Sequence, residues 1–421
     1  MIHTPKTVSL AEAQRIILTS VTPLGPESIH IFKAVKRFLY EDIVADNMIP
    51  PMDSSARDGY AVIAEDTYSA SQDTPVQLKV VGEIQAGALA EGKQVSTGTA
   101  IRIMTGAPIP PGADAVVQFE DTLEQDGYVN IFRRVDRYEN YRCSGENIKK
   151  GEKVLLKGDR LNAADVGILA SVNRDAVEVY RRPTVAVIST GDELAPIGQK
   201  LEPGKVRDVN AYALCAEVAK CNALPKPLGI AKDSLQEVRQ LLDQALDADV
   251  ILSTGGGSMG KYDFVKDAYA DLRVQMKFYR VNVKPGKPCS FGVLGNKLFF
   301  SLPGNPVSAM TSFIQFVRPA LLSLMGAQKL FKPVAQAILD EPINKKPTKN
   351  LRLLRGCFSL QGGEFHVSTT GDQKSSVFKS MRDANCLIIV PENSGPLKAG
   401  EKVRIQLIYH EEIAVSAWDP A

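Results

Sequence analysis

Residues 184–194 read TVAVISTGDEL, and a second stretch of the same kind, ADVILSTGGGS, follows at residues 248–258. Both are apolar, β-branched runs that end at glycine, which is typical of strands buried on both faces of a parallel sheet. Helix-like spacing separates them, and a third such run, KLFFSLPGNP (297–306), leads into a long apolar helix pattern. Because strands alternate with helices over about 140 residues, the pattern predicts a doubly wound, mainly parallel α/β sheet with helices on both faces.

The flanking segments have different hydrophobic patterns. Before the sheet, residues 9–22 predict a helix with a capping box at Ser9 and Glu12, and residues 76–135 predict short strands separated by Gly and Pro. After Pro333, short strands with Gly-rich turns predict a small β-barrel or sandwich. We therefore expect three units. They are an N-terminal α+β and β module (1–180, with a β-rich subdomain at about 46–145), the α/β domain (181–328) and a C-terminal β domain (329–421).

Composition excludes several classes of protein. The 421 residues contain 50 Lys+Arg and 48 Asp+Glu, a net charge of +2, which argues against a disordered chain and against a nucleic-acid coat. The six cysteines are scattered without a CxxC pair, which disfavours a disulfide framework or a zinc knuckle. No stretch reads as a membrane span or a signal peptide. We expect a cytoplasmic protein with neither nucleic acid nor membrane as a partner.

The three predicted strands all end at turns that contain glycine. They run into Gly191-Asp192-Glu193, into Gly255-Gly256-Gly257, and into Pro303-Gly304-Asn305-Pro306. Ligands of open α/β sheets bind outside the carboxyl ends of the strands, and the N–H groups at the following helix starts favour anions. One such turn alone is more often an ordinary βα turn, but three in one sheet favour a phosphate-containing ligand. No P-loop or GxGxxG spacing is present, which disfavours an NTPase or a nicotinamide enzyme.

Charged residues accompany these turns. Glu193, Asp233 and Asp263 are carboxylates suited to Mg²⁺, which prefers oxygen ligands and bridges to phosphate. Lys284 and Lys287, with Arg280 just upstream, would neutralise anionic oxygens. Taken singly, each is more often a solvated surface charge, and only the position at loop ends favours a site.

The motifs resemble those of a known family. STGDEL (189–194), STGGGSMG (253–260), VKPGKP (283–288) and LPGNPVSA (302–309) look, in that order, like the molybdenum-cofactor-biosynthesis domain. SSARDGYAV (54–62) and IRIMTGAPIPPGADAVV (101–117) resemble the N-terminal signature of the MoeA family, the molybdopterin molybdenumtransferases. The C-terminal β module completes that family's layout, so the resemblance covers nearly the whole chain.

The resemblance implies an enzyme that inserts molybdate into adenylylated molybdopterin, with Mg²⁺-dependent release of AMP. The implied catalytic residues are Asp58, Thr105, Glu193, Asp233, Asp263 and Lys284. The implied substrate-binding residues are Arg142, Gly256, Arg280, Lys287, Pro303, Pro306 and Ser376. Glu193, Asp233 and Asp263 would hold the Mg²⁺. By analogy, the protein is a homodimer in which the N-terminal region of one subunit faces the sheet domain of the other.

The chain departs from the family pattern in one stretch, and other functions stay open. Within ENYRCSGENI (139–148), Arg142 keeps one arginine, Cys143 and Ser144 replace two others, and Asn147 replaces an acid. Arg280 stands where lysine is common. A molybdopterin adenylyltransferase, which uses a similar sheet domain, and a gephyrin-like scaffold without catalysis are the alternative functions. The sequence does not distinguish molybdate from tungstate.

Overall fold

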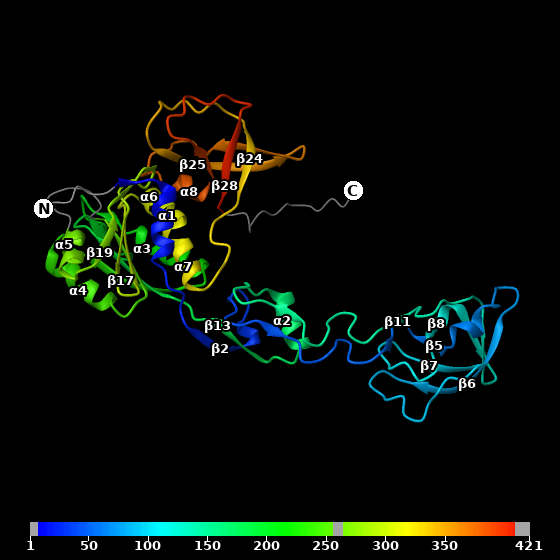
Figure 1. The fold of residues 1–421 in the computed structure, drawn as a ribbon. Helices are drawn as coiled ribbons and strands as arrows, with labels where there is room; N and C mark the ends of the chain where they lie inside the picture. Colours follow the sequence, from blue (N-terminus) through cyan, green and yellow to red (C-terminus); the bar gives the residue numbers. More distant parts are fainter. Residues whose placement is uncertain (1–6, 256–263, 409–421) are drawn as a thin grey trace.

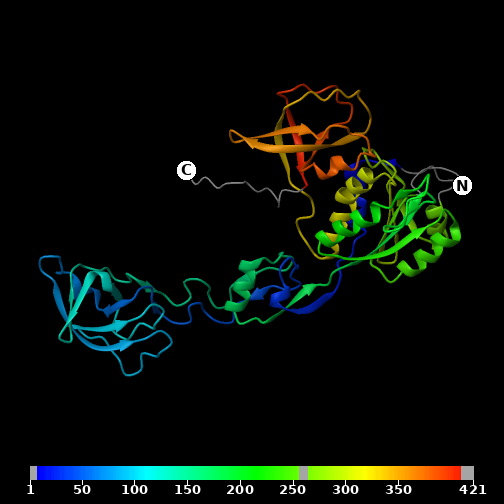
Figure 2. The same ribbon diagram turned by 180° about the vertical axis from the view of Figure 1, so that it is seen from behind.

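The computed structural model describes residues 7–255 and 264–408. A long arm formed by the N-terminal part of the chain projects from a body that contains the α/β sheet and the C-terminal β unit (Figure 1; Figure 2). The chain begins in the body with β1 (Thr7–Val8) and α1 (Leu10–Thr19), runs out along the arm and returns to the sheet. As predicted, Ser9 is the N-cap of α1, and its hydroxyl accepts the Glu12 N–H at 3.1 Å.

A six-stranded sheet forms the centre of the body. Its order is β17 (Leu224–Ala231), β14 (Thr184–Thr190), β18 (Val250–Thr254), β23 (Lys297–Leu302), β22 (Ser290–Leu294) and β19 (Gln275–Phe278). The first four strands are parallel, β22 is antiparallel to them, and β19 pairs antiparallel with β22 at the edge. Apolar side chains of α3 (Asn210–Lys220) pack on one face, and those of α4 (Leu235–Ala245) and α5 (Phe264–Asp271) on the other. This confirms the predicted doubly wound, mainly parallel sheet.

One buried helix runs behind the first face of the sheet. It consists of α6 (Pro306–Ser312), the π-helical turn η4 (Phe313–Val317) and α7 (Arg318–Leu324), with Pro306 in its first turn as predicted. Within the described residues it is the one helix long and apolar enough to cross a membrane, but 89% of it is buried in the protein. Its apolar length is therefore that of a core helix. The sequence pattern did not predict the π-helical turn.

The arm has two parts. Next to the body, β2 (Pro26–His30) pairs with β13 (Ala176–Tyr180), β3 (Ile43–Val44) pairs with β12 (Lys153–Leu155), and α2 (Ala163–Ser171) packs on η1 (Ile31–Lys33). The outer part is the predicted β-rich subdomain. Its sheet has the order β8 (Ala115–Gln118), β5 (Gly59–Val62), β7 (Thr99–Ile103), β6 (Val76–Ile84), β10 (Tyr128–Ile131) and β9 (Thr122–Gln125). β4 (Ser54–Ser55) and β11 (Tyr141–Arg142) pair beside it.

The C-terminal unit is a small closed barrel, as predicted. Its strands are β24 (Val334–Leu339), β25 (Leu351–Gln361), β26 (Glu364–Thr369), β27 (Cys386–Val390) and β28 (Lys402–Leu407), and pairing of β25 with β27 closes it. β21 (Val283–Lys284), from the sheet domain, pairs with β25 and joins the barrel to the body. The sequence pattern missed β24 and the first half of the long strand β25.

A substitution at a tightly packed glycine should destabilise the outer part of the arm and leave the body unaffected. A Cβ atom on Gly59 in β5 would lie 1.9 Å from the Val117 carbonyl oxygen, and that backbone atom is held in the sheet. We expect Gly59→Ala to destabilise the outer arm by roughly 1–3 kcal/mol or more, because overpacking against backbone cannot relax. Calorimetry should show an early transition for the arm and an unshifted one for the body. Gly82→Ala in β6 is the matched control, since its nearest neighbour is a flexible lysine carbon at 3.8 Å. Equal shifts for both variants would contradict this account.

Candidate functional site

Three strand ends meet at one edge of the sheet. The Thr190 hydroxyl at the end of β14 donates to the Thr254 carbonyl at the end of β18 (3.2 Å). Gly255 follows with φ +96°, and a Cβ there would lie 2.4 Å from the Thr190 carbonyl oxygen, so only glycine fits. Gly304, after β23, lies against Gly255: a Cβ on Gly304 would be 3.6 Å from the Gly255 Cα. The predicted turns therefore lie side by side, as the topology of parallel strands requires.

Asn210, which the sequence analysis did not single out, ties α3 to this edge. Its side-chain amide donates to the Gly304 carbonyl at 2.7 Å, and the residue is only 8% exposed. Its Oδ1 atom is buried and accepts no hydrogen bond from the described residues. If the amide were reversed, Oδ1 would face the Gly304 carbonyl oxygen, and two acceptors cannot form a hydrogen bond. The hydrogen bond to Gly304 therefore fixes the orientation of the amide. The asparagine at the start of an apolar helix pattern was the only sequence signal of this role.

The carboxylates of the predicted magnesium site lie in two loops. The Asp192 and Asp233 carboxylates accept each other's backbone N–H, at 3.2 and 3.4 Å, which joins the loop after β14 to the loop after β17. Glu193 folds back so that its Oε2 would be 2.4 Å from a Cβ on Gly191. Asp263 lies outside the described residues, and so does Gly256. Among the described residues, no three His, Cys, Asp or Glu side chains form a cluster suited to a metal ion.

The predicted cationic loop follows β21 and packs against α6. Lys284 is exposed at the end of β21, Lys287 is half-buried, and Arg280 lies in β20 (Arg280–Val281), which pairs with β1. Between the lysines, Gly286 packs on α6, where a Cβ would lie 2.8 Å from the Ser312 hydroxyl. The loop 284–287 therefore lies against the helix that begins at Pro306.

A loop of the barrel completes the edge. The Val307 N–H in the first turn of α6 donates to the Ser375 carbonyl at 3.3 Å. This contact places the predicted residue Ser376 next to the turn that contains Pro303 and Pro306, of which Pro303 is buried and Pro306 half-buried. Residues from the sheet domain and from the barrel thus meet at the start of α6.

Arg355 shapes this serine loop and was missed by the sequence analysis. Its side chain is completely buried in the barrel. The guanidinium donates to the carbonyls of Asp372, Gln373 and Lys374 and to the Ser380 hydroxyl, at 3.0–3.1 Å. Burial lowers the pKa of this guanidinium, and the nearby Asp372 carboxylate partly opposes the shift. An arginine inside the apolar run LRLLRGCF was the available sequence signal.

The predicted N-terminal pair lies in the outer arm. Asp58 directly precedes β5 and Thr105 follows β7, and both are exposed. The Thr105 N–H and hydroxyl both donate to Asp58 Oδ1 at 2.7 Å. These bonds, the backbone one first, lower the pKa of the Asp58 carboxyl. Nearby, the Tyr141 hydroxyl and the Ser144 N–H donate to the Asp53 carboxylate, and Arg142 is exposed on β11.

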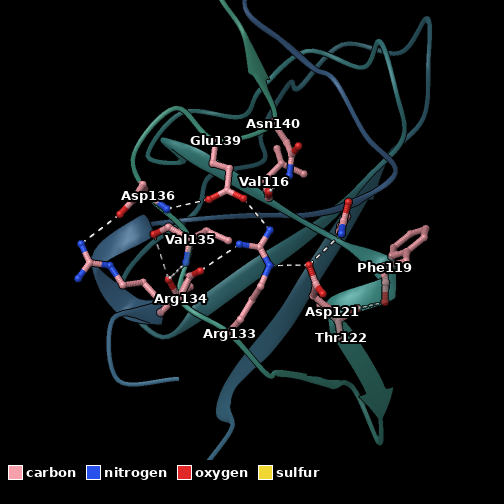
Figure 3. A network of polar contacts seen from close by, with 12 residues as sticks. Val116, Phe119, Asp121, Thr122, Arg133, Arg134, Val135, Asp136, Glu139 and Asn140 are labelled. Atoms are coloured by element: carbon pink, nitrogen blue, oxygen red, sulfur yellow. Dashed lines mark hydrogen bonds and ion pairs between the residues drawn. The ribbon is translucent and has the colours of Figure 1, made fainter. Parts of the chain in front are cut away.

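A charged network fixes the segment that leads into β11 (Figure 3). Arg133 donates to Asp121 and to Glu139, both at 2.6 Å, and the Glu139 partner is the larger cause of the raised pKa of the guanidinium. The arginine in turn lowers the pKa of the Glu139 carboxyl. The Glu139 carbonyl accepts the Val116 N–H at 3.0 Å. Arg142 therefore projects from a braced segment rather than from a loose loop.

Within one chain, the arm pair and the sheet edge are far apart. Both views place β5, β7 and β11 at the outer end of the arm, away from α3 and β17 in the body (Figure 1; Figure 2). The structure brings Asp58 together with Thr105, and the turn residues of the sheet together with the barrel loop, but it does not bring the two groups together. Asn147 is exposed in the arm, and its N–H donates to the Ile49 carbonyl at 3.0 Å.

Comparison with known proteins matches every unit of this layout. Residues 8–173 match the MoeA N-terminal region (domain I and II), residues 186–323 a probable molybdopterin binding domain, and residues 336–408 the MoeA C-terminal region (domain IV). The chain belongs to the MoeA family. The match to the arm and to the barrel, as well as to the sheet domain, favours this family over the adenylyltransferase alternative.

Relatives over the full length support the same assignment. The chain is 35% identical to a molybdopterin molybdenumtransferase of Bacillus subtilis, covering 93% of this chain and 92% of the relative. It is 34% identical to one from Staphylococcus epidermidis, covering 95% of each. The crystal structure of a MoeA protein from Pyrococcus horikoshii superposes with a TM-score of 0.82 at 32% identity, over 96% of this chain and all of the other. The predicted family and enzyme class, molybdopterin molybdenumtransferase, are confirmed.

The Asp58–Thr105 pair gives a titration test. Because the folded pKa of Asp58 is lowered, the stabilising contribution of the pair is present above the unfolded pKa and is lost as the pH falls through the folded value. Thr105→Val removes the hydroxyl donor and keeps the N–H donor, so we expect the pKa of Asp58 to rise part of the way to 3.8. Carbon-13 NMR of the aspartate carboxyls would measure it. An unchanged Asp58 pKa would show that the hydroxyl bond does not form in solution.

Proposed function

We propose that this protein inserts molybdate into adenylylated molybdopterin and releases AMP. In the proposed reaction, water attacks the phosphoanhydride, AMP leaves, and the phosphate stays on molybdopterin. Molybdate then loses one oxo group as water, made with the two dithiol protons, while two Mo–S bonds form. Molybdenum keeps its oxidation state, so the reaction needs no electron donor.

The observation that supports this proposal best is the assembly of loops around α6. The turns after β14, β18 and β23 adjoin one another, the Ser375–Ser376 loop contacts the first turn of α6, and Gly286 of the loop 284–287 packs against Ser312 at the end of that helix. Phosphate and molybdate are both oxyanions, which need N–H groups and cationic side chains. Lys284, Lys287 and Arg280 are the cations that this edge offers, and Pro303 and Pro306 fix the backbone of the turn.

We place the proposed Mg²⁺ beside the acidic loops of the same edge, where the described residues alone do not complete a cluster of three ligands. Asp192, Glu193 and Asp233 offer only oxygen donors, which suit Mg²⁺, and the reciprocal hydrogen bonds hold Asp192 and Asp233 close together. Asp263, outside the described residues, remains the proposed further ligand. The bound ion would neutralise charge on the phosphoanhydride. Asp192 joins the predicted set because of its contact with the Asp233 loop.

We further propose that a second copy of the chain completes the site. Asp58, Thr105 and Arg142 are exposed at the outer end of an arm that extends away from the edge of its own sheet. The segments that carry Asp58 and Arg142 are braced, and the network around Arg133 maintains their geometry. An isologous homodimer would set each arm against the sheet edge of the partner.

The direct test is AMP release from adenylylated molybdopterin by the purified protein with Mg²⁺, with and without molybdate. We expect release to depend on molybdate. Lys284→Ala should weaken substrate binding about ten- to a hundredfold, because a charge-assisted hydrogen bond contributes about 1.5–3 kcal/mol. Lys398→Ala, an exposed lysine of the barrel, is the matched control. Absence of AMP release under all conditions would refute the proposal, and unchanged binding by Lys284→Ala would remove that lysine from the site.

Complementation tests the shared site. Asp58→Ala alters the arm and Asp233→Ala the sheet edge, and each variant alone should be inactive while remaining folded. In an equal mixture, half the dimers are mixed and each holds one site with two native halves, so about a quarter of the activity should return. Native mass spectrometry would confirm that mixed dimers form. Mixed dimers without activity would contradict a site built from two chains.

A further inference from the structure

Asp53 holds the arm segment on both sides of Arg142. Its carboxylate accepts the Tyr141 hydroxyl at 2.5 Å and the Ser144 N–H at 2.8 Å. Tyr141 directly precedes Arg142, and Ser144 follows it by two residues. One half-buried side chain therefore bridges the short stretch that carries the arginine. Asp53 is not among the residues that the sequence analysis predicted for the site.

The backbone of this segment has little other support. β11 pairs with β4 over only two residues, and so short a ladder has little stability of its own. The turn after β11 is joined to Pro50, whose carbonyl accepts the Gly145 N–H at 2.9 Å. Asp53 joins the ladder, through Tyr141, to this turn, through Ser144.

Tyr141 is suited to transmit the constraint. Its ring contacts the Tyr138 ring edge-on, with 5.2 Å between the ring centroids, and its hydroxyl is held by Asp53. Burial is the first cause that raises the pKa of Tyr141, and the hydrogen bond to Asp53 adds to it, so the hydroxyl stays protonated and can donate. A tyrosine held at its ring and at its hydroxyl leaves the backbone at position 141 little freedom.

The side chain of Arg142 has no such support. It is exposed, and it forms no hydrogen bond or ion pair with the described residues. The protein can therefore direct this guanidinium only by fixing the backbone from which it projects. The network around Arg133 braces the segment before Arg142 (Figure 3), and Asp53 braces the segment on both sides.

Backbone contacts connect this part of the arm to the Asp58–Thr105 pair. The Gly106 N–H, next to Thr105, donates to the Ser55 carbonyl at 2.8 Å. Asp53 thus begins the short segment 53–58, which ends at Asp58 and is held in the middle by the loop after β7. The arginine and the Asp58 carboxylate are therefore parts of one connected framework.

We infer that Asp53 is a positioning residue that sets Arg142 in a fixed relation to Asp58. The inference rests on the proposed function, in which Arg142 binds substrate at the sheet edge of a second copy of the chain. Asp53 itself contacts no substrate in this arrangement, and it acts through Arg142. Once Arg142 is removed, Asp53 has nothing left to position, so the effects of the two residues are coupled.

A double-mutant cycle tests this coupling. KM for adenylylated molybdopterin is measured from AMP release with Mg²⁺ and molybdate. Asp53→Ala should raise KM about fivefold or more and leave kcat nearly unchanged, because it weakens binding and not the chemical step. Arg142→Ala should raise KM about ten- to a hundredfold. The double variant should match Arg142→Ala alone, and effects that simply multiply would overturn the inference.

Two further variants separate positioning from a general effect on folding. Asp53→Asn keeps an acceptor for the Ser144 N–H and offers an amide donor to the Tyr141 oxygen, so KM should stay near the native value. Asp66→Ala is the matched control, because the Asp66 carboxylate accepts the Gly98 N–H at 2.8 Å elsewhere in the same subdomain. It should leave KM unchanged. If Asp53→Asn raised KM as much as Asp53→Ala does, charge and not hydrogen bonding would be responsible, and the inference would be wrong.

Hydrogen exchange, followed by mass spectrometry, keeps this test separate from the reaction. In Asp53→Ala the segment 139–148 should exchange faster, because the Ser144 N–H loses its acceptor, while β5 and β7 should exchange as in the native protein. If the native protein releases no AMP, the proposed reaction fails, and faster exchange confined to 139–148 still supports the role of Asp53. Unchanged exchange in this segment would overturn the inference even if the enzyme is active.

Discussion

The close approach of the loops after β14, β18 and β23 is the constraint on which the rest of the structure depends. Parallel strands all end at one edge, and the Thr190–Thr254 hydrogen bond draws two of these ends so near that only Gly255 fits between them. Backbone groups, and not side chains, therefore form the floor of the site. The Asp192 and Asp233 carboxylates lie in the loops after β14 and β17, and the lysines of the loop 284–287 come from outside these strand ends.

Backbone and side-chain hydrogen bonds hold the barrel in position against the sheet domain. β21 pairs with β25, and Gln315 of the π-helical turn donates to Gln406 of β28 at 2.5 Å inside the protein. Arg355 is buried and forms no ion pair with the described residues, and its guanidinium donates to three carbonyls of the loop 372–374. Because an unsatisfied buried cation is very unfavourable, these hydrogen bonds favour the observed conformation of the loop. The position of Ser376 at the sheet edge follows from that conformation.

Much of the fold was predictable because it depends on periodicity. Alternating strand and helix patterns indicated the mainly parallel sheet and the helix at Pro306. The resemblance gave Asp58 and Thr105 as separate site residues, and their mutual hydrogen bonds were not predicted. Asn210 and Arg355 were not predictable, because their importance lies in partners about 94 and 17–25 residues away in sequence. β24 was missed because its sequence, VAQAIL, does not alternate apolar and polar residues, and the π-helical turn leaves no mark in an apolar run.

The arm poses a different physical problem, because the residues proposed to act there are exposed. An exposed carboxylate is normally free to rotate, yet both Thr105 donors bind the same oxygen of Asp58 and hold the group in one orientation. The same hydrogen bonds lower the pKa of the carboxyl and so stabilise its ionised form. Ordering a side chain before its partner arrives reduces the entropy lost on association. This ordering favours the proposal that the Asp58 carboxylate completes a site on a second copy of the chain.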